Sequence, residues 1–111
     1  MAGEFTLRQL RYFTAAAAAG TTQAAAEEMF VSQSAMSSAL AELEAALGAQ
    51  LFVRRRGKGL GLTETGRSLL PMARQLLADA DELSSAAQHL QDELEGPLTI
   101  ACFDVLAPSL L

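Results

Sequence analysis

Cysteine and histidine are almost absent from this chain, in which Cys102 and His89 are the single examples. A lone cysteine excludes an internal disulfide framework and fits a reducing cytosol, and it leaves open a reactive thiol or a half-buried side chain. The sequence has no Cys–His pair, no second histidine and no cluster of residues with metal-ligand spacing. We therefore expect no catalytic residue, no metal site and no cofactor, and hence a protein that is not an enzyme.

Tryptophan is absent too, and aromatic residues make up only 5% of the sequence. Because half of the 111 residues are hydrophobic, a packed core is feasible, but it must be built from alanine, leucine and methionine. This composition, with few β-branched residues, favours a mainly α fold. No stretch approaches the length of a membrane span, and the alanine run after Arg11 is too weakly apolar for a secretory signal. We expect no membrane contact and a cytoplasmic location.

The net charge of −5 argues against a nucleic-acid partner, because phosphate contacts need cations. The acidity is confined to one part of the chain, however. Residues 1–62 hold six basic and five acidic side chains, a net charge of +1, whereas residues 63–95 hold two basic and seven acidic ones, a net charge of −5. The dense basic cluster of the chain lies in the first part and consists of Arg54, Arg55, Arg56 and Lys58.

Three short helices are predicted before residue 50. The first runs from about Thr6 to Ala19 and ends at Gly20, and its apolar face consists of Leu7, Leu10, Phe13, Thr14 and Ala17. The second covers residues 23–30 and is capped by Thr21 or Thr22, with Ala25, Ala26 and Met29 on one face.

The third helix begins after the N-cap Ser32 and closes at Gly48. Its core stripe is Met36, Leu40, Leu43 and Leu47, and its outer side carries Gln33, Ser34, Ser37, Ser38, Ala41 and Ala45. This helix contains no lysine or arginine, and it carries Glu42 and Glu44.

A hairpin and a long helix follow. LFV (51–53) and LGL (60–62) are strand-like runs around a basic, glycine-rich turn. Thr63 then caps a helix that runs to about Leu94, and Pro71 predicts either a later start or a kink. A seam with a period of about 3.5 residues favours dimerisation through this helix over packing on its own domain alone. The seam consists of Leu69, Ala73, Leu76, Ala80, Leu83, Ala87, Leu90 and Leu94.

These segments resemble the LysR-type transcriptional regulators. The resemblance lies in LRQLRYF (7–13), AAEEMFVSQSAMS (25–37), LEAALGAQLFVRR (43–55) and LTETGRSLLPMAR (62–74), in this order and spacing. It implies a mainly α fold, with a winged helix-turn-helix of three helices plus a β-hairpin wing, followed by a long dimerisation or linker helix. The implied divisions are a DNA-binding domain at 5–62 (helix-turn-helix about 22–41, wing about 51–62), a linker helix at 63–95, and the start of a truncated effector-binding domain at 96–111.

The resemblance also implies a bacterial regulator that binds double-stranded promoter DNA as a homodimer, and as a tetramer when full length. A small-molecule inducer would act only through a C-terminal domain that 111 residues cannot hold. The strand-like and helix-like run at 97–111, which includes Cys102, would open that domain.

The third helix would enter the major groove with its N-terminal half against the bases. There Gln33 can make a bidentate contact with adenine, and Ser34, Ser37 and Ser38 can serve either base type. The family pattern has proline, arginine and a polar residue where this chain has Ser34, Ser38 and Ala39, so a guanidinium is missing. The cations would come from Arg54, Arg55, Arg56 and Lys58, reaching phosphates and the adjacent minor groove.

Blander interpretations stay open for several of these residues. The basic cluster could be a solvated turn, and Arg54 or Arg55 could pair with an acidic side chain. Arg8 and Arg11 could touch phosphate or only face solvent. As a whole, the chain could be a protein-interaction module, a winged-helix dimer with little or no DNA affinity, because its third helix has no cation.

Overall fold

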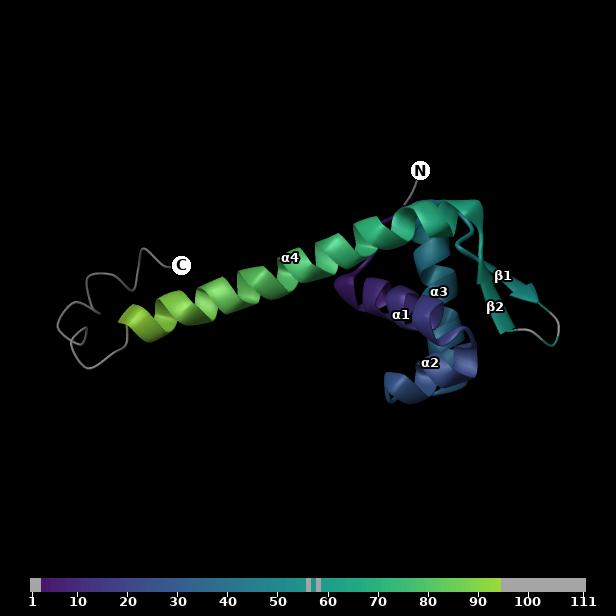
Figure 1. The fold of residues 1–111 in the computed structure, drawn as a ribbon, viewed down its shortest axis with the longest axis horizontal. Coiled ribbons are helices and arrows are strands. Elements are labelled where there is room, and N and C mark those ends of the chain that lie inside the picture. The colour runs from purple at the N-terminus through teal and green to yellow at the C-terminus, as the bar shows by residue number, and fades with distance from the viewer. Residues whose placement is uncertain (1–2, 56, 58, 95–111) are drawn as a thin grey trace. The chain divides into compact units, whose positions relative to one another are not determined.

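A computed structural model of the chain describes residues 3–55, 57 and 59–94. Its elements are α1 (Leu7–Ala19), α2 (Thr22–Glu28), α3 (Gln33–Leu47), β1 (Phe52–Arg55), β2 (Gly59–Leu62) and α4 (Glu64–Leu94), as Figure 1 shows. The predicted mainly α fold with a two-stranded wing and a long helix is confirmed. The chain divides into two units, Met1–Leu77 and Ala78–Leu111, with the boundary inside α4. The strand and helix predicted at 97–111 lie outside the described residues.

Local side chains and glycines cap the helix ends, as predicted for Gly20 and Ser32. Thr6 begins α1 with a capping box: its hydroxyl accepts the Gln9 N–H at 3.0 Å, and the Gln9 side chain accepts the Thr6 N–H at 3.0 Å. Gly20 ends α1 with a φ of 81°, a conformation that glycine adopts at little cost. Of the two candidate caps for α2, Thr21 is the one used, because its hydroxyl accepts the Ala24 N–H. Ser32 caps α3 in the same way.

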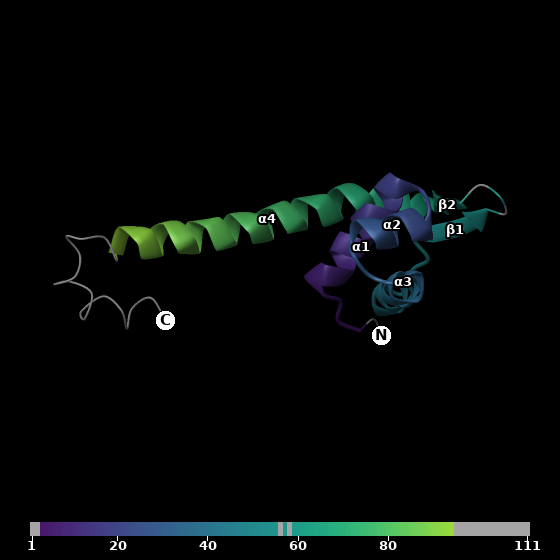
Figure 2. The ribbon, with the colours of Figure 1, turned by 90° about the horizontal axis from the view of Figure 1, so that it is seen from below.

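The core of the first unit is built where α1, α2, α3 and the start of the hairpin meet. Phe13 and Phe52 meet edge to face with ring centroids 5.6 Å apart. Figure 2 looks along the axis of α3 and shows α1 and α2 lying across it. The fully buried large side chains are Phe13, Met36, Leu43 and Leu51. The predicted stripe on α3 is confirmed for Met36, Leu40 and Leu43, whereas Leu47 is half-buried.

The apolar face of α1 is wider than predicted. Tyr12, Ala15 and Ala16 are buried because α1 packs against both α2 and α3. The small alanine side chains allow such close approach on two sides. Leu7, which was placed on the buried face, is 40% exposed, because it lies in the first turn, beyond the end of this packing.

The hairpin is antiparallel, with Arg54 opposite Leu60 and Arg55 opposite Gly59. Its second strand is attached to the α1–α2 turn, since the Leu60 N–H donates to the Gly20 carbonyl at 2.8 Å. Its base is attached to the start of α4. The Thr63 N–H donates to the Leu51 carbonyl at 2.9 Å, and the Thr63 hydroxyl donates to the Gln50 carbonyl at 2.6 Å.

Helix α4 begins at Glu64, as the cap at Thr63 predicts, and continues through Pro71. A start near Pro71 is therefore wrong. Proline removes one helical hydrogen bond, but Leu70 and Ala73 on either side pack against the core and hold the helix together. From Asp81 to Glu93 every residue is exposed. Within the described ranges, no helix is both long and apolar enough to cross a membrane.

Replacing Gly66 by alanine is expected to destabilise the protein by about 1–3 kcal/mol. A Cβ at this buried position would collide with the backbone carbonyl of Leu51, which cannot turn aside as a flexible side chain would. The helix-propensity gain of about 1 kcal/mol from glycine to alanine offsets only part of that cost. Urea unfolding measures the change, with Ser68→Ala at an exposed position of the same turn as the control. A Gly66→Ala protein as stable as the control would contradict the packing described.

Candidate nucleic-acid interface

The first two turns of α3 present a polar, uncharged surface. Gln33, Ser34 and Ser38 are exposed, and Ser37 is half-buried. The Ser32 hydroxyl accepts the Ala35 N–H at 3.0 Å and also lies 3.2 Å from the Ser34 hydroxyl. Ser32 is therefore occupied by capping, as the sequence predicts, and Ser34 has one of its hydrogen-bonding positions filled. Within the part of the chain that the structure describes, no hydrogen bond occupies the side chains of Gln33 and Ser38.

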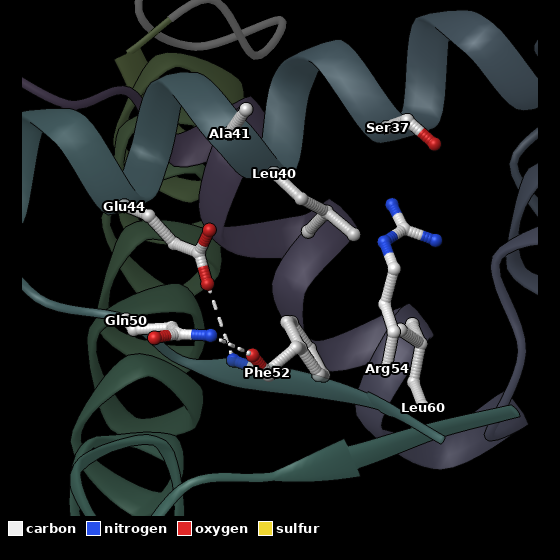
Figure 3. Close-up of a pocket in the computed structure, with 8 residues that line it drawn as sticks. All are labelled: Ser37, Leu40, Ala41, Glu44, Gln50, Phe52, Arg54 and Leu60. Atoms are coloured by element: carbon white, nitrogen blue, oxygen red, sulfur yellow. Dashed lines mark hydrogen bonds between the residues drawn. The ribbon is translucent and has the colours of Figure 1, made fainter. Parts of the chain in front are cut away.

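A cleft separates α3 from the hairpin, and Arg54 extends into it. The cleft has a volume of about 300 Å³, and its walls include Ser37, Leu40 and Glu44 from α3 and Phe52 and Arg54 from β1. The Arg54 side chain points from β1 toward Ser37 (Figure 3). The structure thus places a guanidinium beside α3, a helix that has none of its own.

Arg54 also borders a second cleft, of about 240 Å³, on the side of Gln33. The remaining walls come from Arg55, from β2, and from the start of α2, where Thr21, Thr22 and Gln23 take part. Sequence reasoning did not assign these α2 residues to the site. Their place depends on the hydrogen bond between Leu60 and Gly20, which joins segments 40 residues apart and has no local sequence signal.

The two described arginines of the wing lie on opposite faces of the hairpin. Successive side chains of a strand alternate, so Arg54 shares the face of Phe52 and Arg55 shares that of Val53. The Arg55 guanidinium folds over Gly61, in the space that a side chain there would fill. Among residues 3–55, 57 and 59–94, no acidic side chain forms an ion pair with either arginine. Arg56 and Lys58, predicted in the same cluster, lie outside the described residues.

The two acids of α3 both accept hydrogen bonds within the protein. One Glu44 carboxylate oxygen accepts the backbone N–H groups of Leu51 at 2.7 Å and Phe52 at 3.1 Å (Figure 3). Glu42 accepts a hydrogen bond from Gln9 of α1 at 3.3 Å. Two charge-assisted hydrogen bonds thus join the Glu44 carboxylate to the backbone at the start of the hairpin.

Three leucines of the predicted dimerisation seam are exposed: Leu76 is 45% exposed, Leu83 73% and Leu90 51%. Ala73 is buried and Leu69 half-buried in the first unit, while Ala80 is half-buried and Ala87 exposed. Leu76 also borders an apolar groove within the first unit, lined by Phe5, Leu10, Phe13, Leu47, Leu69, Met72 and Ala73. Met72 and Phe5 were not among the predicted residues.

Arg8 and His89 each contact a side chain one turn away on their own helix. The Arg8 guanidinium donates to the Tyr12 hydroxyl at 3.0 Å and lies over its ring, on α1 itself. His89 lies 3.3 Å from Glu93, one turn along α4, and both are exposed. Across the described part of the chain, no three His, Cys, Asp or Glu side chains are placed to hold a metal ion.

Residues 7–67 match the family described as bacterial regulatory helix-turn-helix protein, lysR family. A probable hydrogen peroxide-inducible genes activator from Mycobacterium xenopi is 40% identical over 106 residues, which cover 96% of this chain and 56% of that protein. The transcriptional regulator EstR from Acinetobacter baylyi is 35% identical over 111 residues, 100% of this chain and 36% of EstR. The chain thus spans little more than half the length of these curated relatives, or less.

Two solved structures have the same fold and contain DNA. The CbnR_DBD–DNA complex has a TM-score of 0.74 and 36% identity, and the alignment covers 78% of this chain and 99% of that one. The BenM_DBD complex with benA site 1 DNA has a TM-score of 0.73 and 29% identity, with 78% and 97% covered.

Proposed function

Since the chain belongs to the lysR family of bacterial regulatory helix-turn-helix proteins, we propose that it binds double-stranded promoter DNA as a homodimer and so regulates transcription in the cytoplasm. The observation that carries this proposal is the Arg54 guanidinium beside the exposed first turns of α3, which puts a cation next to polar side chains suited to reading base edges. In this proposal residues 5–62 bind DNA and residues 63–95 supply the dimer contact. The chain acts by binding and has no catalytic role.

The contacts divide into base readout and phosphate binding. Gln33, Ser34, Ser37 and Ser38 face base edges in the major groove, where the glutamine amide can pair with adenine. Arg54, Arg55, Arg56 and Lys58 supply positive charge along the phosphate backbone and toward the minor groove. The start of α2, with Thr21 and Gln23, borders the cleft beside Arg54, and these two side chains would add hydrogen bonds to the phosphate backbone.

Dimerisation increases the sequence discrimination of a single protomer. One α3 helix with four small polar readers discriminates weakly, whereas two copies on adjacent half-sites multiply the discrimination. The exposed leucines at 76, 83 and 90 and the apolar groove beside Leu76 supply surface that a second copy can cover. The curated relatives extend beyond the part that this chain matches, and we place any tetramer contact and small-molecule inducer site in such an additional domain.

The most direct test of the proposal is selection from genomic DNA. The purified protein is incubated with sheared genomic DNA of its source, and the retained fragments are sequenced against the input at low and at physiological salt. Enrichment of a short inverted repeat is the expected result, because a symmetric dimer reads the same half-site twice. Retention without a motif would show that phosphate is bound and that the bases are not read.

Salt titration counts the phosphates that are bound. If each protomer neutralises about three phosphates, a dimer neutralises about six, and the slope of log K against log salt is expected to be about −5. Fluorescence anisotropy with a labelled duplex at several salt concentrations gives this slope. A slope near zero would contradict an electrostatic role for the wing.

A protein-interaction module is the second candidate function, and the absence of lysine and arginine from α3 favours it. A protein partner seated on α3 would not need the basic cluster of the wing, whereas DNA does. Arginine reversal on the wing therefore separates the two functions.

A further inference from the structure

Glu44 stands in an unexpected place for a protein that binds a polyanion. It lies on α3, the proposed recognition helix, and lines the same cleft as Ser37 and Arg54. A carboxylate there lowers DNA affinity through repulsion if it does nothing else. Its contacts with the wing indicate what else it does.

The Glu44 carboxylate binds the first residues of the wing by two charge-assisted hydrogen bonds. It accepts the N–H groups of Leu51, which directly precedes β1, and of Phe52, the first residue of β1; both side chains are buried in the core. Bonds of this kind are stronger than those between neutral groups and constrain direction. Within the described residues they are the hydrogen bonds that join α3 to the hairpin.

This attachment also sets where Arg54 lies. Residues 52 and 54 are on the same face of β1, and Ser37 and Glu44 are two turns apart on the same side of α3. The cleft between the two elements therefore has Glu44 bonded to the strand near one end and Arg54 reaching Ser37 near the other (Figure 3). A shift of β1 away from Glu44 would move Arg54 away from α3.

We propose that Glu44 is a positioning residue for DNA binding: it holds the wing against the recognition helix so that Arg54 and the α3 readers contact one DNA site together. The inference rests on the proposed function and goes further, because it assigns to an acid on the DNA-binding helix a favourable effect on affinity. If Glu44 only repels DNA, its removal should raise DNA affinity. If it positions the wing, its removal should lower DNA affinity.

The test compares Glu44→Ala and Glu44→Gln with Glu42→Ala and Glu42→Gln, which make the same charge changes on the same helix. Binding to a fluorescein-labelled duplex of mixed sequence is measured against salt. We expect Glu44→Ala to weaken DNA binding about tenfold or more. The slope of log K against log salt should also flatten from about −5 toward about −3, because the wing is no longer held where its cations meet the DNA phosphates. Glu44→Gln, which keeps one acceptor, should fall between, and the Glu42 variants should bind as well as the wild type or slightly better.

A double-mutant cycle with Arg54→Ala shows whether Glu44 acts through the wing. In the Arg54→Ala background, Glu44→Ala should have little further effect, since the positioned group is already gone. An equal effect in both backgrounds would overturn the proposal, as would tighter binding by Glu44→Ala. Circular dichroism of each variant verifies that the helices remain folded.

Hydrogen exchange of the free protein tests, without DNA, whether Glu44 attaches the wing to α3. Glu44→Ala should accelerate exchange at the amides of Leu51, Phe52 and Leu60 and leave those of α1 unchanged. Uniform acceleration, or none, would overturn the positioning role. If the wild type shows a salt slope near zero while these amides respond as expected, the proposed function fails and the attachment of the wing by Glu44 stands.

Discussion

Reversing the charge of Arg54 and Arg55 by changing both to glutamate is expected to lower DNA affinity at least about a thousandfold at physiological salt. Each hydrogen bond to a charged group contributes about 1.5–3 kcal/mol, and a dimer loses four such arginines. The new carboxylates also repel the backbone, and the log–log salt slope should fall by about 3–4. Anisotropy with a labelled duplex over a range of salt concentrations measures both quantities.

The matched control changes Arg67 and Arg74 to glutamate. These arginines are exposed on α4, outside the hairpin, and the double change gives the same net charge. It should weaken binding far less, because only long-range, screened repulsion acts from α4. Equal losses in the two proteins would mean that net charge, and not the wing, controls binding. A wing-reversed protein that still binds DNA would remove the wing from the interface and strengthen the case for a protein partner.

Changing Leu83 and Leu90 to glutamate is expected to abolish dimerisation at micromolar concentration. Burying a leucine contributes about 1.5–3 kcal/mol, and a symmetric dimer loses four of them and gains four charges at the seam. The dimer dissociation constant should therefore rise at least about a thousandfold. Sedimentation velocity measures the change, and DNA binding should fall with it, since two half-sites can no longer be held together.

Because both leucines are exposed in the single chain, this test leaves the monomer fold intact. Ala78→Glu with Ser85→Glu is the control: these residues have the same spacing, are exposed, and lie on the face of α4 opposite the seam. The control should remain dimeric. If it dissociates as readily as the leucine variant, the seam is not the contact and the long helix must associate through another face.

Local chemistry explains why the sequence predicted so much of the fold. The hydroxyls of Thr6, Ser32 and Thr63 and the glycines at 20 and 48 act within a few residues of themselves, so their capping roles can be read without tertiary information. The stripe on α3 likewise follows from helical period alone. The prediction for Pro71 left two possibilities, because the packing of Leu70 and Ala73 that holds the helix there depends on the rest of the core.

The geometry of the interface could not be predicted in the same way. The sequence showed Arg54 and Arg55 as one basic cluster, and only the strand register places them on opposite faces. The contacts of Glu44 could not be predicted either, because its partners are backbone N–H groups that carry no sequence signal. The α2 residues of the second cleft were missed because the fold, and not the sequence, brings them next to β2.

Three consecutive residues, Gln50 to Phe52, donate hydrogen bonds to α3, accept them from the cap of α4, and pack into the core. They form a mechanical junction between the helix proposed to read the bases and the helix proposed to join two protomers. The backbone N–H and the hydroxyl of Thr63 join the start of α4 to this junction. A change in the relative placement of the two protomers would therefore move the strand that carries Arg54. Such a movement would alter the affinity of the dimer for DNA.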